Sequence, residues 1–206
     1  MLQNDSLTRF LALGDSYTIG EGVLEQERWP NQLADRLRDR GYELDVTILA
    51  RTGWTTGELT DAMRAAPPAG RFDLVSLLIG VNNQYRGLDL DSYRAEFSSL
   101  LEQSLHLADG RRGRVIVLSI PDWSVTPFAA GRERIRIAAQ IEEFNAVNRE
   151  ISQRAGVRYV DVTSVSRLAL HDPSLLADDR LHPSGRMYSL WTDLVIPEAL
   201  AALNKI

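Results

Sequence analysis

Five short apolar runs alternate with segments of helical character, and this alternation restricts the fold of the chain more than any other feature. The apolar runs lie at residues 9–13, 45–49, 74–79, 115–120 and 157–160. The helical patterns lie at about residues 30–40, 57–65, 90–108, 132–154 and 184–202. Near-continuous apolar strands that alternate with helices are typical of a parallel sheet covered by helices on both faces. The sequence therefore predicts an α/β fold.

We expect the five strands to form one sheet in the flavodoxin-like order 2-1-3-4-5, built with right-handed crossovers. In this order the first strand lies between the second and the third. Open α/β sheets bind their ligands at the carboxyl ends of the strands, where the strand order reverses. Ser16, Gly53 and Asn82 follow the first three apolar runs. The expected ligand-binding edge of the sheet therefore carries these three residues.

Length and composition predict one globular domain over residues 1–206, with 44% hydrophobic and 25% charged residues. The chain has no cysteine, which excludes disulfides, thiolate metal sites and cysteine nucleophiles. No run approaches the ~18 apolar residues of a membrane span, and the first apolar run is too short for a signal peptide. We expect a cytoplasmic protein; the sequence does not indicate its oligomeric state.

Charge excludes further classes of protein. The net charge is −5 and the arginines are scattered, which argues against nucleic-acid binding. The only lysine is Lys205, near the end of the chain, so no lysine is available for a Schiff base or a phosphate-binding P-loop. Clusters of acidic residues and histidine with metal-ligand spacing are also missing, and we expect neither a metal nor another cofactor.

Ser16 ends the first apolar run, in Gly14-Asp15-Ser16. A hydroxyl on such a turn is exposed above the edge of the sheet, where it can act as a nucleophile or hold a phosphate, although most serines at turns only cap or shape the backbone. A nucleophilic serine needs a base, and without a usable lysine the candidates are the three histidines. His106 falls in a predicted helix and His171 fits a helix end or turn, whereas His182 falls in a loop.

His182 is the best candidate for the base because Asp179 precedes it by three residues. Pro183 favours an extended backbone at His182, and the Asp-x-x-His spacing can bring carboxylate and imidazole to one side of a turn. Asp179 would then orient the ring and select its tautomer. By itself this spacing more often belongs to an acid at a helix start next to a loop histidine.

Two further residues can assist acyl chemistry at the same edge. The Asn82 side chain can donate a hydrogen bond to an oxyanion. Gly53 can add a backbone N–H at a place where a side chain would obstruct the approach. Taken singly, an asparagine or a glycine at such a position more often belongs to an ordinary turn.

Together, Gly14-Asp15-Ser16, Gly53, Gly80-x-Asn82 and Asp179-x-x-His182 resemble the four ordered blocks of the GDSL-type, or SGNH, hydrolases. The resemblance extends from the first strand to the last helix. It implies a three-layer α/β/α sandwich and a carboxylic ester hydrolase.

The resemblance also implies the role of each residue. Ser16 would be the nucleophile, His182 the base and Asp179 the acid that orients it. The oxyanion hole would consist of the Ser16 N–H, the Gly53 N–H and the Asn82 amide. The third block of the family often reads Gly-x-Asn-Asp, and here the last position is Asn83.

The expected reaction is hydrolysis of a small-molecule ester through an acyl-enzyme, without a cofactor, and with a short acyl or acetyl group because no long lipophilic lid is evident. Aromatic residues follow several strand ends, namely Tyr17, Trp54, Tyr85 and Trp123. We take the last three as candidates for substrate binding, although core packing is the commoner role of such residues.

Two other functions fit part of the sequence. In a flavodoxin-like binding protein, residues 16–18 and 20–22 would hold the phosphate of a flavin or nucleotide. That function leaves Asn82 and the pair Asp179/His182 without a role. A carbohydrate- or lipid-binding module with an inactive triad fits less well, because no triad position is missing.

Overall fold

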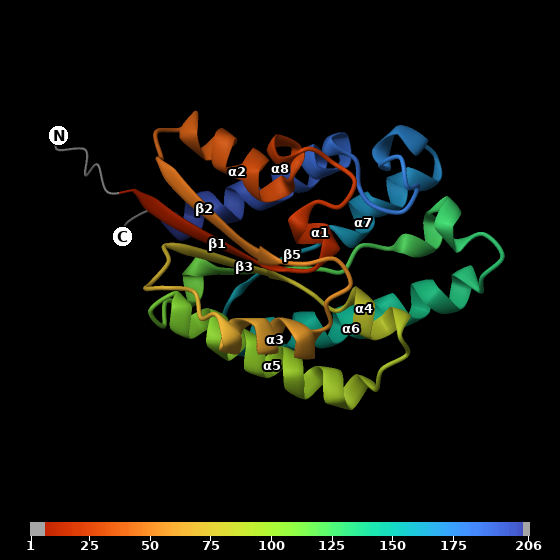
Figure 1. Cartoon of the computed structure of the whole chain (residues 1–206), viewed down its shortest axis with the longest axis horizontal. Helices are drawn as coiled ribbons and strands as arrows, with labels where there is room; N and C mark the ends of the chain where they lie inside the picture. The colour runs from red at the N-terminus through yellow and green to blue at the C-terminus, as the bar shows by residue number, and fades with distance from the viewer. Residues whose placement is uncertain (1–6, 204–206) are drawn as a thin grey trace.

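The computed structural model describes residues 7–203, so Lys205 lies outside the described residues. Its centre is a five-stranded parallel sheet in the order β2-β1-β3-β4-β5 (Figure 1), which confirms the predicted order. The strands are β1 (Thr8–Gly14), β2 (Leu44–Ala50), β3 (Leu74–Leu78), β4 (Val115–Leu118) and β5 (Arg158–Val160). All of them lie at the predicted runs, with small differences at the ends.

Five long helices match the predicted helical segments. They are α2 (Trp29–Arg38), α3 (Thr56–Ala65), α5 (Leu90–Leu107), α6 (Arg134–Ala155) and α8 (Gly185–Leu203). Three short helices, α1 (Ser16–Ile19), α4 (Val81–Tyr85) and α7 (Thr163–Ser166), follow strands directly. Helices of one turn are too short to show a periodic apolar pattern, so periodicity did not predict them.

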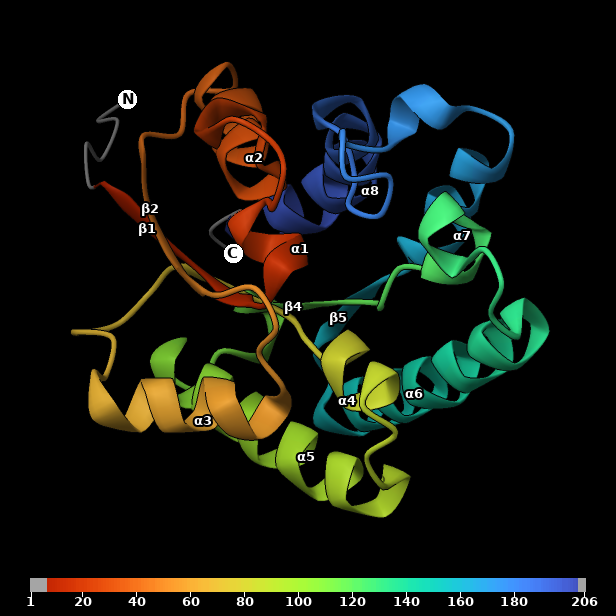
Figure 2. The same cartoon turned by 45° about the vertical axis from the view of Figure 1, so that its right-hand side comes forward.

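The helices form two layers around the sheet. Helices α2 and α8 pack together on one face, and α3, α5 and α6 cover the other (Figures 1 and 2). The expected three-layer α/β/α sandwich is confirmed. Every residue of β3 and β4 is buried, which explains why these strands read as continuous apolar runs. Among residues 7–203, no helix combines the length and the apolar character needed to span a bilayer.

The register of the sheet brings three chain segments to one edge. Gly14 at the end of β1 pairs with Ala50 of β2 and with Leu78 of β3. The chain therefore leaves these three parallel strands at the same level. Because β1 is followed in sequence by its neighbour on one side, β2, and then by its neighbour on the other, β3, the strand order reverses between β1 and β3.

Candidate active site

Ser16 is the first residue of α1 and is almost fully buried, so the prediction of an exposed hydroxyl was wrong: larger side chains surround Ser16 in a cavity. The preceding Asp15 caps this helix, and its side chain accepts a hydrogen bond from the Tyr17 N–H at 3.0 Å. A Cβ on Gly14 would collide with the Thr18 side chain and the Leu78 carbonyl. The turn that presents Ser16 therefore depends on the residues on its N-terminal side.

Asp15 is a fully buried carboxyl group beside the nucleophile candidate. Burial raises its pKa to about 7, although hydrogen bonds from the backbone of Tyr17 and Gly80 act in the opposite direction. Its Oδ2 atom has no hydrogen-bond partner among the described residues. Burial of this carboxyl group is unfavourable, but its other oxygen, Oδ1, caps α1.

Asp179 and His182 form a close pair in the loop before α8. The distance between Asp179 Oδ2 and His182 Nδ1 is 2.5 Å, and Asp179 Oδ1 accepts hydrogen bonds from the N–H groups of Leu181 and His182, both at 2.9 Å. Partial burial acts to raise the pKa of Asp179, but these hydrogen bonds outweigh burial and lower it. An ionised carboxylate only accepts hydrogen bonds, so Nδ1 carries the proton and Nε2 is left as the basic nitrogen.

The segment around α1 supports this pair from two sides. The ring of Tyr17 lies edge-to-face against the His182 ring, with centroids 5.6 Å apart. Gly22 has a φ of +81°, and a Cβ there would approach Ala177 Cβ to 2.9 Å and Asp179 Oδ2 to 3.7 Å. The loop after α1 thus packs closely against the loop that carries Asp179.

Asn82 and Gly53 approach Ser16 from the ends of β3 and β2. One N–H of the Asn82 amide donates to the Trp54 carbonyl at 2.9 Å, which leaves its second N–H for another acceptor. Within residues 7–203, the backbone N–H groups of Ser16 and Gly53 have no hydrogen-bond acceptor. Three donors without protein partners therefore belong to residues that line one cavity.

The reason for glycine at position 53 differs from the expected one. A Cβ at Gly53 would meet nothing closer than an Arg86 nitrogen at 3.9 Å, so space does not require glycine. The backbone conformation requires glycine instead, because a residue with a side chain rarely adopts the left-handed φ of +87° found at Gly53.

A cavity of about 190 Å³ connects these residues. Its lining consists of Ser16, Tyr17, Thr52, Gly53, Val81, Asn82, Tyr85, Trp123, Phe128, Leu181 and His182. Asp179 is not part of this lining, but it contacts His182, which is. Trp54, the third candidate for substrate binding, is not part of this lining and contributes its backbone carbonyl to Asn82 instead.

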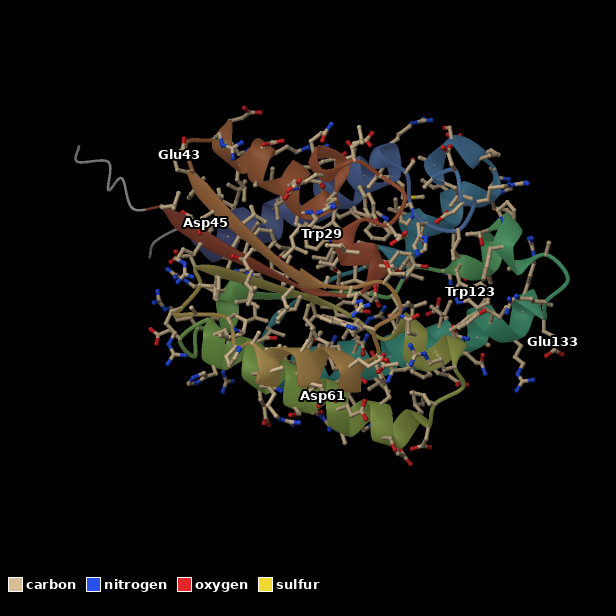
Figure 3. The ribbon with its side chains drawn as sticks, viewed as in Figure 1. Trp29, Glu43, Asp45, Asp61, Trp123 and Glu133 are labelled. Carbon is tan, nitrogen blue, oxygen red and sulfur yellow. The ribbon has the colours of Figure 1, made fainter. Side chains whose placement is uncertain are left out.

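Three aromatic rings form one side of the cavity, and we call Tyr85, Trp123 and Phe128 the aromatic wall. The centroid of the Trp123 ring lies 5.6 Å from that of Tyr85 and 5.9 Å from that of Phe128. The indole N–H of Trp123, which is labelled in Figure 3, donates to Gln84 Oε1 at 2.9 Å and so restrains the ring. Sequence reasoning missed Phe128, because it lies in a short 3₁₀ turn away from any strand end.

The remaining candidates lie elsewhere. His106 and His171 are exposed and do not line the cavity. Thr18, which a phosphate loop would use, is fully buried, and the Glu21 carboxylate accepts a hydrogen bond from Thr52 in the same region. This loop therefore lacks the form and charge of a phosphate site. Among residues 7–203, no group of three or more histidine or acidic side chains is placed to hold a metal ion.

Comparisons with known proteins point in one direction. A profile of the GDSL-like lipase/acylhydrolase family matches residues 12–190. The fold is similar to that of TesA (TM-score 0.73, 20% identity, covering 96% of this chain and 100% of that one). It is also similar to a lipase/acylhydrolase from Enterococcus faecalis (TM-score 0.73, 20% identity, covering 97% of this chain and 98% of that one). A third similar structure is Axe2, an acetylxylan esterase from Geobacillus stearothermophilus (TM-score 0.71, 20% identity, covering 100% of this chain and 98% of that one). No curated protein sequence matches the chain significantly.

Proposed function

The chain belongs to the GDSL-like lipase/acylhydrolase family and is a carboxylic ester hydrolase, and on that premise we propose that Ser16, His182 and Asp179 are its catalytic triad. One observation carries this proposal. Ser16 and His182 line the same cavity, and Asp179 Oδ2 lies 2.5 Å from Nδ1 of the His182 ring. The three side chains come from segments near residues 16 and 180 of the sequence, and their proximity supports the proposed triad.

In the first half of the reaction, His182 Nε2 accepts the proton of the Ser16 hydroxyl while Ser16 Oγ attacks the ester carbonyl carbon. The negative charge that develops on the carbonyl oxygen is stabilised by the Ser16 N–H, the Gly53 N–H and the free N–H of Asn82. His182 then transfers the proton to the leaving alcohol, and the acyl group stays on Ser16.

In the second half, a water molecule replaces the alcohol. His182 accepts a proton from this water, the resulting hydroxide attacks the acyl carbonyl, and the same donors stabilise the oxyanion. His182 then returns the proton to Ser16 Oγ as the acid leaves. No step requires a cofactor.

We propose a short acyl group, such as acetyl, for the substrate. The cavity of about 190 Å³ is smaller than the ~300–1,000 Å³ of pockets that enclose drug-sized ligands. Acetyl esters are also the substrates that the name of the acetylxylan esterase indicates for that structural neighbour. A series of 4-nitrophenyl esters from acetate to decanoate tests this point, and a maximum of kcat/KM at long chains would contradict it.

The triad itself is tested by substitution. Ser16→Ala and His182→Ala are each expected to reduce hydrolysis of 4-nitrophenyl acetate by at least ~10³-fold, because the residues act as one unit. His106→Ala and His171→Ala are matched controls, since both histidines are exposed and outside the cavity. Circular dichroism and thermal unfolding check that each variant folds. A folded Ser16→Ala variant with normal turnover would refute the assignment of the nucleophile.

A further inference from the structure

Arg132 lies against all three rings of the aromatic wall. Its guanidinium carbon is 4.9 Å from the ring centroid of Phe128, 5.4 Å from that of Tyr85 and 5.7 Å from that of Trp123. The side chain makes one long hydrogen bond, 3.4 Å, to the Tyr85 hydroxyl. Arg132 is exposed, as are parts of Tyr85 (47%) and Phe128 (39%). A cation therefore sits at the outer end of the wall that lines the catalytic cavity.

Two arginine side chains of this segment, Arg132 and Arg134, have no ion-pair partner among the described residues, whereas Arg136 pairs with Glu133 at 3.2 Å. Glu133, at the start of α6, lies on the same side of the molecule as Trp123 in Figure 3. The chain as a whole carries a net charge of −5. Two arginines without ion pairs in the described part of the chain therefore lie near the aromatic wall, and an unpaired cation of this kind can interact with an anionic group on a ligand.

We propose that Arg132 binds a carboxylate on the substrate, so that the preferred esters are anionic. This inference rests on the proposed function and adds the substrate class. The aromatic rings hold the guanidinium in place, and its N–H groups, apart from the one that donates to the Tyr85 hydroxyl, remain free to form hydrogen bonds with a carboxylate. The ester group lies at Ser16, the middle of the molecule packs against the aromatic wall, and the carboxylate reaches Arg132.

Two pairs of esters test the proposal, each with an anionic member and a neutral member of similar size. In one pair the acyl group varies: 4-nitrophenyl hemisuccinate against 4-nitrophenyl levulinate. In the other the alcohol varies: 4-carboxyphenyl acetate against 4-carbamoylphenyl acetate. Values of kcat/KM are corrected for spontaneous hydrolysis. The anionic-to-neutral ratio is then compared between the wild-type enzyme and its variants, so that the intrinsic reactivity of each ester cancels.

Arg132→Gln is expected to lower this ratio by roughly tenfold in at least one pair, mainly through KM, because it removes a charge-assisted contact and keeps a side chain of similar length. Arg136→Gln is the matched control, because Arg136 lies in the same segment but pairs with Glu133. It should leave the ratio unchanged. High salt should lower the wild-type ratio towards that of Arg132→Gln.

Other results would overturn the proposal. If Arg132→Gln slows the anionic and neutral members of both pairs equally, Arg132 only supports the aromatic wall. If its ratios equal those of the wild-type enzyme, Arg132 does not contact the substrate. In either case hydrolysis of the neutral esters would leave the proposed function intact. If the folded wild-type enzyme cleaves none of the four esters, the proposed function itself fails.

Discussion

Asn82 and Asn83 are neighbours in sequence with different surroundings. Asn82 lines the cavity and has one N–H free for an oxyanion. Asn83 is buried; its Oδ1 accepts from the Thr56 N–H at 3.1 Å, and its Nδ2 donates to Thr56 Oγ1 at 2.7 Å. The Thr56 hydroxyl in turn donates to Glu96. An aspartate at position 83 would lose the N–H donor and bring a second carboxylate to Thr56, which explains why asparagine suits this chain.

These surroundings predict that one alanine substitution affects mainly kcat and the other mainly stability. Asn82→Ala is expected to lower kcat by ~10²–10³-fold with little change in KM, because its amide meets a charge that exists only in the transition state. Asn83→Ala is expected to lower stability by about 1–3 kcal/mol, since Thr56 loses its partner, with a much smaller effect on kcat. Steady-state kinetics and urea unfolding of both variants measure these effects. Equal kcat values would remove Asn82 from the proposed oxyanion hole.

At the scale of elements, the position of α4 depends on Gly80. This residue caps the helix with a φ of +128°, and a Cβ there would collide with the Tyr93 hydroxyl and lie 2.9 Å from Ile120 Cδ1. Tyr93 cannot move easily, because it is buried and its hydroxyl bonds to Asn148 at 2.7 Å. Close packing beneath α4 therefore determines where Asn82 lies.

Gly80→Ala should consequently lower both stability and kcat. We expect a loss of at least ~1–3 kcal/mol from backbone strain and collision, together with reduced turnover as α4 shifts. Gly110→Ala is the matched control: Gly110 has a φ of +71° but no atom within 4 Å of the added Cβ. It should show only the backbone cost and normal kcat. If both variants lose the same stability and keep full activity, packing under Gly80 does not position α4.

At the scale of the whole molecule, Asp15 links folding to pH. Its pKa is about 7 in the folded protein and near 3.8 in an exposed carboxyl group. Between pH 3.8 and about pH 7, Asp15 keeps its proton in the folded state but has released it in the unfolded state. The free energy of unfolding therefore falls as pH rises, by about 1.4 kcal/mol per pH unit from this group, and the loss is complete above about pH 7.

Asp15→Asn removes this titration. We expect the stability of the wild-type protein relative to Asp15→Asn to decrease from pH 5 to pH 7 and to stay constant at higher pH. Urea unfolding of both proteins at several pH values measures the difference, in which the other ionisable groups largely cancel. Parallel pH profiles would show that Asp15 does not retain a proton in the folded protein.

The sequence by itself determined the sheet, its strand order and the positions of the candidate triad. Apolar runs such as residues 74–79 are local patterns that burial on both faces of a sheet imposes. Ser16, Asn82 and His182 could be found because each follows a recognisable element or belongs to a short spaced motif. The predicted polar residues therefore lie together at one edge of the sheet, as the topology requires.

Only the tertiary structure decided which aromatic residues line the cavity. Trp54 follows a strand but lies outside the lining, whereas Phe128 follows no strand and lies within it. Arg132 reaches the same rings from the start of the segment that leads into α6. The physical reason is that these loop residues are positioned by long-range contacts, such as the hydrogen bond from Trp123 to Gln84, and such contacts leave no periodic or spaced pattern in the sequence.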